Sequence, residues 1–95
     1  MSGYVIVDVQ ITDAAAYEQY RAGVAATLAA YGGKFVVRAG RMELLEGSWD
    51  LSRLVVLEFP SAERAKAWWS SHEYAPLKRL RQRAAATRMV VVEGV

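Results

Sequence analysis

The sequence contains no cysteine, only two prolines and a single histidine among its 95 residues. The lack of cysteine excludes disulfide bonds, thiol catalysis and cysteine-ligated metal ions. One histidine is too few for a histidine-rich metal site, so we expect neither a metal ion nor a cofactor. The longest uncharged stretch, residues 22–33, is rich in alanine and glycine and is too short to span a bilayer.

The chain also lacks a large excess of one charge, because it has twelve basic and ten acidic residues and a net charge of only +2. This balance does not indicate a nucleic-acid partner. The first residues lead directly into an apolar segment without the basic and hydrophobic regions of an export signal. We therefore expect a cytoplasmic protein that forms one domain over residues 1–95.

Hydrophobic periodicity predicts the order of the elements. Residues 4–11 alternate as in a strand, and apolar residues then recur every three or four positions in a helix that begins after Thr12 or Asp13 and ends at Gly32-Gly33. Further strands are predicted at 34–39, with a continuation through 41–46 past a bend, and at 53–59 and 88–93. A helical region beginning at Ser61 is broken near 70–73, where Ser70 and Glu73 have the spacing of a capping box.

The predicted order is βαββαβ, which is typical of a ferredoxin-like α+β fold. Right-handed crossovers would give a four-stranded antiparallel sheet with helices on one face. The other face would carry apolar side chains such as Ile6, Val36 and Val56. Because a second copy would remove that face from water, we expect a homodimer.

Four segments carry a family resemblance: residues 3–9 (GYVIVDV), 31–40 (YGGKFVVRAG), 53–61 (RLVVLEFPS) and 71–74 (SHEY). They resemble the bacterial domain-of-unknown-function family 1330 over essentially the whole chain, although family members often have proline at the position of His72. The resemblance implies a dimeric α+β barrel in which two ferredoxin-like protomers pair their sheets. The same superfamily includes cofactor-free monooxygenases, lactone isomerases, polyketide cyclases and stress proteins, so the resemblance implies a fold rather than one reaction.

Three charged residues of predicted strands are candidate catalytic groups: Asp8, Arg38 and Glu58. If the strand register brings them to one face, Arg38 can hold an anionic oxygen and either carboxylate can move a proton. Sheet register is not fixed by the sequence. The alternative is an ion-pair network that only stabilises the sheet or the dimer.

Candidate substrate-binding residues are Tyr20, Trp49, Trp69 and His72. The aromatic side chains can line a flat apolar pocket, although aromatics at helical spacing usually belong to a core. Trp68 and Trp69 are adjacent, so only one of them is expected to point inward. His72 can act as a general base, or it can cap the helix that follows it.

A basic run from Lys78 to Arg88 lacks the aromatic motif of ferredoxin-like RNA binders, so we expect a solvated helix face there. Two functional hypotheses follow from the sequence. The first is a homodimer that binds a small organic molecule, with cofactor-independent activity of the monooxygenase, isomerase or cyclase type on an oxygenated or aromatic substrate. The second is a non-catalytic dimeric module with a structural or stress-response role.

Overall fold

The computed structural model describes residues 1–95 and contains four strands and three helices in the predicted order. They are β1 (Gly3–Ile11), α1 (Ala14–Ala30), β2 (Lys34–Arg38), β3 (Leu54–Phe59), α2 (Ala62–Trp69), α3 (Ala75–Ala84) and β4 (Ala85–Glu93). The strands form one antiparallel sheet in the order β2-β3-β1-β4. This topology confirms the ferredoxin-like α+β fold predicted from the sequence.

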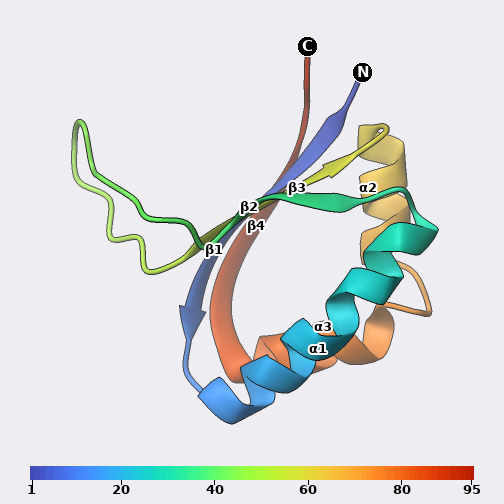
Figure 1. Cartoon of the computed structure of the whole chain (residues 1–95), viewed down its shortest axis with the longest axis horizontal. Coiled ribbons are helices and arrows are strands. Elements are labelled where there is room, and N and C mark those ends of the chain that lie inside the picture. The colour runs from blue at the N-terminus through green and yellow to red at the C-terminus, as the bar shows by residue number, and fades with distance from the viewer.

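All three helices lie on the same side of the sheet (Figure 1). Alternation along β1 buries Val5, Val7 and Val9 beneath the helices and turns Ile6 and Asp8 to the opposite side. We call these two sides the helix-covered face and the helix-free face. None of the helices combines the length and the hydrophobicity that a membrane span requires.

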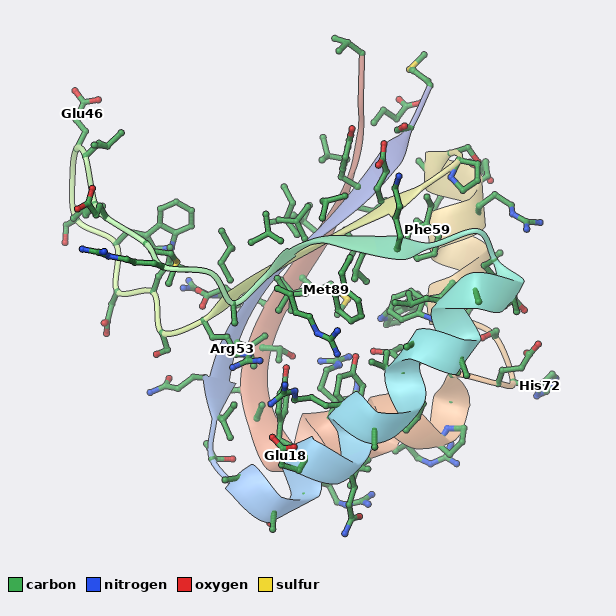
Figure 2. The ribbon with its side chains drawn as sticks, viewed as in Figure 1. Glu18, Glu46, Arg53, Phe59, His72 and Met89 are labelled. Atoms are coloured by element: carbon green, nitrogen blue, oxygen red, sulfur yellow. The ribbon has the colours of Figure 1, made fainter.

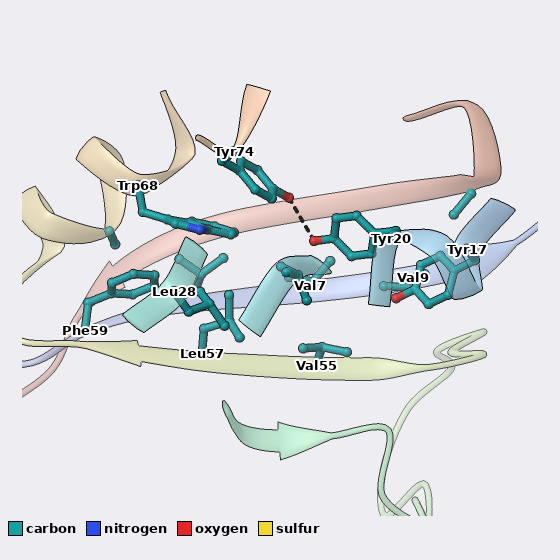
Figure 3. Close-up of a cluster of buried hydrophobic side chains, with 14 of the residues drawn as sticks. Val7, Val9, Tyr17, Tyr20, Leu28, Val55, Leu57, Phe59, Trp68 and Tyr74 are labelled. Carbon is teal, nitrogen blue, oxygen red and sulfur yellow. Dashed lines mark hydrogen bonds between the residues drawn. The ribbon is translucent and has the colours of Figure 1, made fainter. Parts of the chain in front are cut away.

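Aromatic rings fill the centre of the core between the helices and the sheet (Figure 3). Trp68 is 0% exposed, and its ring centroid lies 4.0 Å from that of Tyr74 and 5.5 Å from that of Phe59. The indole Nε1 donates a hydrogen bond to Thr27 Oγ1 at 3.0 Å, so the polar edge of the buried ring is satisfied. Trp69 remains 43% exposed, which confirms that only one of the adjacent tryptophans points inward.

Side-chain caps begin the first two helices, and a buried serine joins the second to the third. Asp13 Oδ1 accepts from Ala16 N, and Ser61 Oγ accepts from Arg64 N, as expected from their positions. The predicted capping box of Ser70 and Glu73 is wrong, because Ser70 instead ends α2. Ser71 Oγ accepts from Tyr74 N at 3.1 Å and donates to the carbonyl of Trp68, which fixes the corner between α2 and α3.

The predicted strand at 41–46 is also wrong, because residues 39–53 form a long loop without regular structure. Ala39 has φ of 57°, which turns the chain away from the sheet directly after β2. Leu45, near the tip, is 95% exposed and packs on no neighbouring strand. The loop projects on the side of the sheet opposite to the helices (Figure 1), so the segment lacks the partner that a strand needs. In contrast, β4 begins three residues earlier than predicted, because Ala85 already pairs with Ile11.

Gly3 offers a test of this packing, because β1 passes very close to the start of α2. A Cβ atom at Gly3 would lie 2.3 Å from Ala62 N, a backbone atom that cannot rotate away. We predict that Gly3→Ala lowers the free energy of unfolding by about 1–3 kcal/mol, which corresponds to a melting temperature lower by roughly 5–15 °C. Gly40→Ala is the matched control, because nothing lies within 4 Å of the added atom. Equal melting temperatures for the two variants would contradict this placement of β1 against α2.

Candidate functional site

A cavity of about 30 Å³ lies between α1 and the helix-covered face of the sheet. Its walls come from every strand and every helix, and its lining residues are Val7, Val9, Tyr17, Tyr20, Arg21, Val24, Phe35, Arg38, Arg53, Val55, Leu57, Trp68, Arg81 and Met89. This volume admits one or two water molecules or a small polar group, but not a whole aromatic ring. A larger ligand must therefore extend out of the cavity or displace side chains that line it.

The cavity is lined by four arginines and by no aspartate, glutamate or histidine. Arg21 has a counter-charge, since Nη1 lies 2.7 Å from Glu18 Oε1 at the surface. The guanidinium of Arg38 lies 4.3 Å from the ring centroid of Phe35. That of Arg53 lies 5.5 Å from the ring centroid of Tyr17, and its Nε is buried without a hydrogen-bond partner. The polar surface of the cavity is therefore cationic.

Hydroxyl groups surround the most deeply buried arginine. Arg81 is only 4% exposed, and its Nε donates to Tyr74 Oη at 3.2 Å while Nη1 donates to Thr87 Oγ1. Tyr74 Oη also shares a hydrogen bond of 2.9 Å with Tyr20 Oη (Figure 3). Burial, together with the neighbouring Tyr74, raises the pKa of Tyr20 well above its ordinary value. The phenol of Tyr20 therefore stays protonated and is a hydrogen-bond donor or acceptor rather than a base.

The structure does not bring the three predicted catalytic residues together. Arg38 lines the cavity, whereas Asp8 and Glu58 lie on the helix-free face. The two carboxylates are also far apart along the strands, because Asp8 pairs with Leu54, four residues from Glu58. Four residues of strand span about 13 Å.

A β-bulge explains why Arg38 is on the other face. Lys34 pairs with Glu58 and Phe35 with Leu57, but the register then shifts so that Val37 pairs with Val56 and Arg38 with Val55. The extra residue, Val36, reverses the alternation of β2. Strict alternation along residues 34–39 would place Arg38 on the same face as Lys34, and the bulge instead places it on the helix-covered face.

Both carboxylates have polar or basic neighbours within contact distance. Arg88 Nη2 lies 2.6 Å from Asp8 Oδ2. The hydroxyl of Ser2 donates to Glu58 Oε2 at 2.8 Å, and this bond, with those from Tyr4 and Lys34, holds the pKa of Glu58 below its ordinary value. A carboxylate with a lowered pKa is a poor proton shuttle near neutral pH, so the surroundings of Glu58 favour the ion-pair alternative.

Of the predicted substrate-binding residues, only Tyr20 lines the cavity. Trp49 is 56% exposed in the loop and lies beside Asp8 and Val90 in a hollow of the helix-free face. Trp69 lies outside the cavity, with Lys78 Nζ 3.6 Å from its ring centroid. His72 is exposed at the outer end of the helical layer (Figure 2), and no side chain caps the first turn of α3.

Sequence reasoning missed Arg53 and Arg81 as cavity residues. The prediction of a solvated basic run holds for the exposed Arg79 and Arg83 but is wrong for Arg81. A signal was present in the spacing, because Arg81 follows Tyr74 by seven residues and precedes Ala84 by three. This places Arg81 on the apolar stripe of α3, where a charge indicates a buried polar network.

The family model for a domain of unknown function, DUF1330, matches residues 2–95. The chain belongs to the DUF1330 family. This confirms the resemblance seen in the sequence. No functionally curated protein is detectably similar to the chain in sequence.

Solved structures of low sequence identity share the fold. RPA0582, a protein of unknown function from Rhodopseudomonas palustris, aligns with a TM-score of 0.78 and 19% identity over 99% of this chain and 82% of its own. SnoaB, a cofactor-independent oxygenase from Streptomyces nogalater, aligns with a TM-score of 0.66 and 13% identity over 99% of this chain and 93% of its own. Rv0793 from Mycobacterium tuberculosis aligns with a TM-score of 0.58 and 16% identity over 100% of this chain and 96% of its own.

The buried hydroxyl of Tyr20 predicts a specific loss of stability in alkali. Because its pKa is raised in the folded state, the unfolded chain releases this proton first, and stability falls as the pH rises above about 10. We predict that the free energy of unfolding of Tyr20→Phe falls less steeply above pH 10 than that of the wild type, by about 1.4 kcal/mol per pH unit. Urea unfolding at pH 8 and pH 11 measures the difference. Tyr31→Phe, which lies outside the network, is the control and should lose as much stability as the wild type. Identical losses in all three proteins would contradict the buried hydroxyl pair.

Proposed function

We propose that this protein is a homodimer that binds a small oxygenated organic molecule in the cavity beneath α1 and acts on it without a cofactor. The observation that carries the proposal is the lining of the cavity, in which hydrophobic walls surround converging guanidinium and hydroxyl groups. The structural likeness to SnoaB supports the same type of chemistry by analogy of fold. Monooxygenase, isomerase and cyclase reactions are the candidate reaction types.

Arg38 and Tyr20 supply the chemistry in this proposal. A guanidinium donates to a carbonyl oxygen and becomes a stronger partner as that oxygen gains charge, so Arg38 would stabilise an enolate. The protonated hydroxyl of Tyr20 would orient a second oxygen. Since the cavity offers no carboxylate or imidazole as a base, the substrate must itself be acidic enough to ionise beside the arginines.

The helix-free face supports the homodimer. Its centre is formed by Ile6, Val56 and Val90, which lie side by side in the register of β3, β1 and β4, and Val90 is 55% exposed. Burial of such a face removes apolar area from water at about 25 cal/mol per Å². A second copy presents the same apolar strip, as an isologous contact requires.

A non-catalytic module remains the second candidate function. The absence of aspartate, glutamate and histidine from the cavity favours it, because general acid–base catalysis ordinarily uses these groups. Under this alternative the protein holds its ligand and releases it unchanged. Product analysis after incubation with an ionisable aromatic enol in air distinguishes the two.

Arg38→Ala tests the ligand-binding role. We predict that the variant stays folded and dimeric but binds 1,3-dihydroxynaphthalene at least tenfold more weakly, because a charge-assisted hydrogen bond contributes about 1.5–3 kcal/mol. Isothermal titration calorimetry measures the affinity. Arg79→Ala removes an exposed guanidinium outside the cavity and should bind as the wild type does. Unchanged affinity of Arg38→Ala would refute the assigned role of Arg38.

Val90→Asp tests the dimer. A carboxylate at the centre of the helix-free face would be buried without a partner in the assembly, so we predict a monomer at micromolar concentration. Light scattering after size-exclusion chromatography reports the mass. Ala26→Asp places the same charge on an exposed position of α1 and should remain a dimer. A dimeric Val90→Asp protein would show that the helix-free face is not the interface.

A further inference from the structure

Arg81 is an anomaly in the core, because it is a buried guanidinium without a carboxylate. Its recorded partners, Tyr74 Oη and Thr87 Oγ1, are neutral, and these bonds use Nε and Nη1, leaving Nη2 as a free donor. No acidic side chain pairs with it, and none lines the cavity that it faces. Buried charges in proteins are ordinarily paired, because burial removes the water that stabilises them.

Arg53 repeats the anomaly in the lining of the same cavity. It precedes β3, and its Nε is buried without a hydrogen-bond partner, although a guanidinium normally uses its donors. Its recorded neighbour is the ring of Tyr17, which offers a π-face but no negative charge. Arg53 and Arg81 therefore leave at least two spare donor atoms, and two positive charges without a carboxylate partner, around one cavity.

We propose that this cavity receives the carboxylate group of a small organic acid, which completes the hydrogen bonds of Arg81 and Arg53. The assignment rests on the proposed ligand-binding function and names the ligand class. A planar carboxylate accepts several hydrogen bonds from guanidinium forks, and its charge compensates the two arginines.

The size of the cavity selects the group that enters it. A volume of about 30 Å³ holds a carboxylate in place of one or two waters, but it does not hold a ring. The body of the acid would then extend toward Arg38, which is exposed and lies at the outer part of the cavity over Phe35. Arg53 and Arg81 thus bind the carboxylate, and Arg38 contacts an oxygen atom farther along the ligand.

The two hydroxyl groups around Arg81 favour a monoanion over a more highly charged group. Tyr20 and Tyr74 already share one hydrogen bond, and Tyr20 keeps its proton. While that mutual bond is kept, only one of the two phenols has a proton free to donate to an anion. A carboxylate needs few additional donors once two guanidiniums hold it, whereas a phosphate has more oxygen atoms to satisfy and is larger.

Matched ligands test the charge and the shape of the bound group. We expect the wild-type protein to bind benzoate at least tenfold more tightly than benzamide, which has nearly the same shape but no charge, and more tightly than inorganic phosphate. Calorimetry at one ionic strength measures all three affinities. Equal affinity for benzoate and benzamide would overturn the proposal, and tighter binding of phosphate would overturn the assignment of a carboxylate.

Matched variants locate the binding. Arg81→Gln and Arg53→Gln should each weaken benzoate binding at least tenfold, while Arg79→Gln, an exposed residue of α3, should leave it unchanged. Because Arg81→Gln is at risk of misfolding in the core, the half-buried Arg53 provides the second variant. Benzoate binding that resists both substitutions would overturn the proposed site.

The same titrations separate this inference from the function on which it rests. If 1,3-dihydroxynaphthalene binds through Arg38 but benzoate shows no preference over benzamide, only the carboxylate assignment fails. If dihydroxynaphthalene, benzoate and benzamide all fail to bind, the ligand-binding function fails with it.

Discussion

Helices cover only one face of the four-stranded sheet, and the two kinds of surface in this protein follow from that coverage. Alternate residues of each strand meet either the helices or the open side, so Val7 and Val55 enter the core while Ile6 and Val56 do not. The helix-covered face holds the aromatic core and a cationic cavity. The helix-free face holds an apolar strip with ion pairs near its ends, which suits a second copy of the chain.

Charge is distributed unequally between these two faces. On the helix-free face each carboxylate has a basic neighbour, as Asp8 has Arg88 and Glu58 has Lys34. Within the cavity Arg81 has only hydroxyl partners. Ion pairs that are already satisfied stabilise a fold or an interface, whereas unsatisfied donors in a cavity are available to a ligand. The electrostatic pattern is therefore the basis for proposing ligand binding under the helices and assembly on the open face.

Element order could be predicted from periodicity, because strands and helices repeat their apolar residues at different spacings. The face of the sheet on which Arg38 lies could not be predicted, because it depends on a β-bulge at Val36. No glycine or other residue in the sequence indicates that bulge. The register of β1 and β3 places Asp8 and Glu58 on the same face but far apart. This register also could not be predicted, because it depends on contacts between segments that are distant in the sequence. The role of Arg81 was accessible in principle, since a charge on the apolar stripe of a helix is itself informative. Periodicity predicts a strand in part of the loop at 39–53, because apolar residues such as Leu44 and Leu45 are typical of a strand, and only the structure shows that they lack a partner.

Native mass spectrometry of the purified wild-type protein, followed by denaturing spectra of the same sample, tests the central claim that the two faces serve assembly and ligand binding. The account predicts twice the mass of the 10.5 kDa chain, with an additional small mass that denaturation releases and that ionises as a carboxylic acid. A monomer would contradict the role of the helix-free face. A dimer that stays bare after incubation with excess benzoate would contradict the role of the cavity.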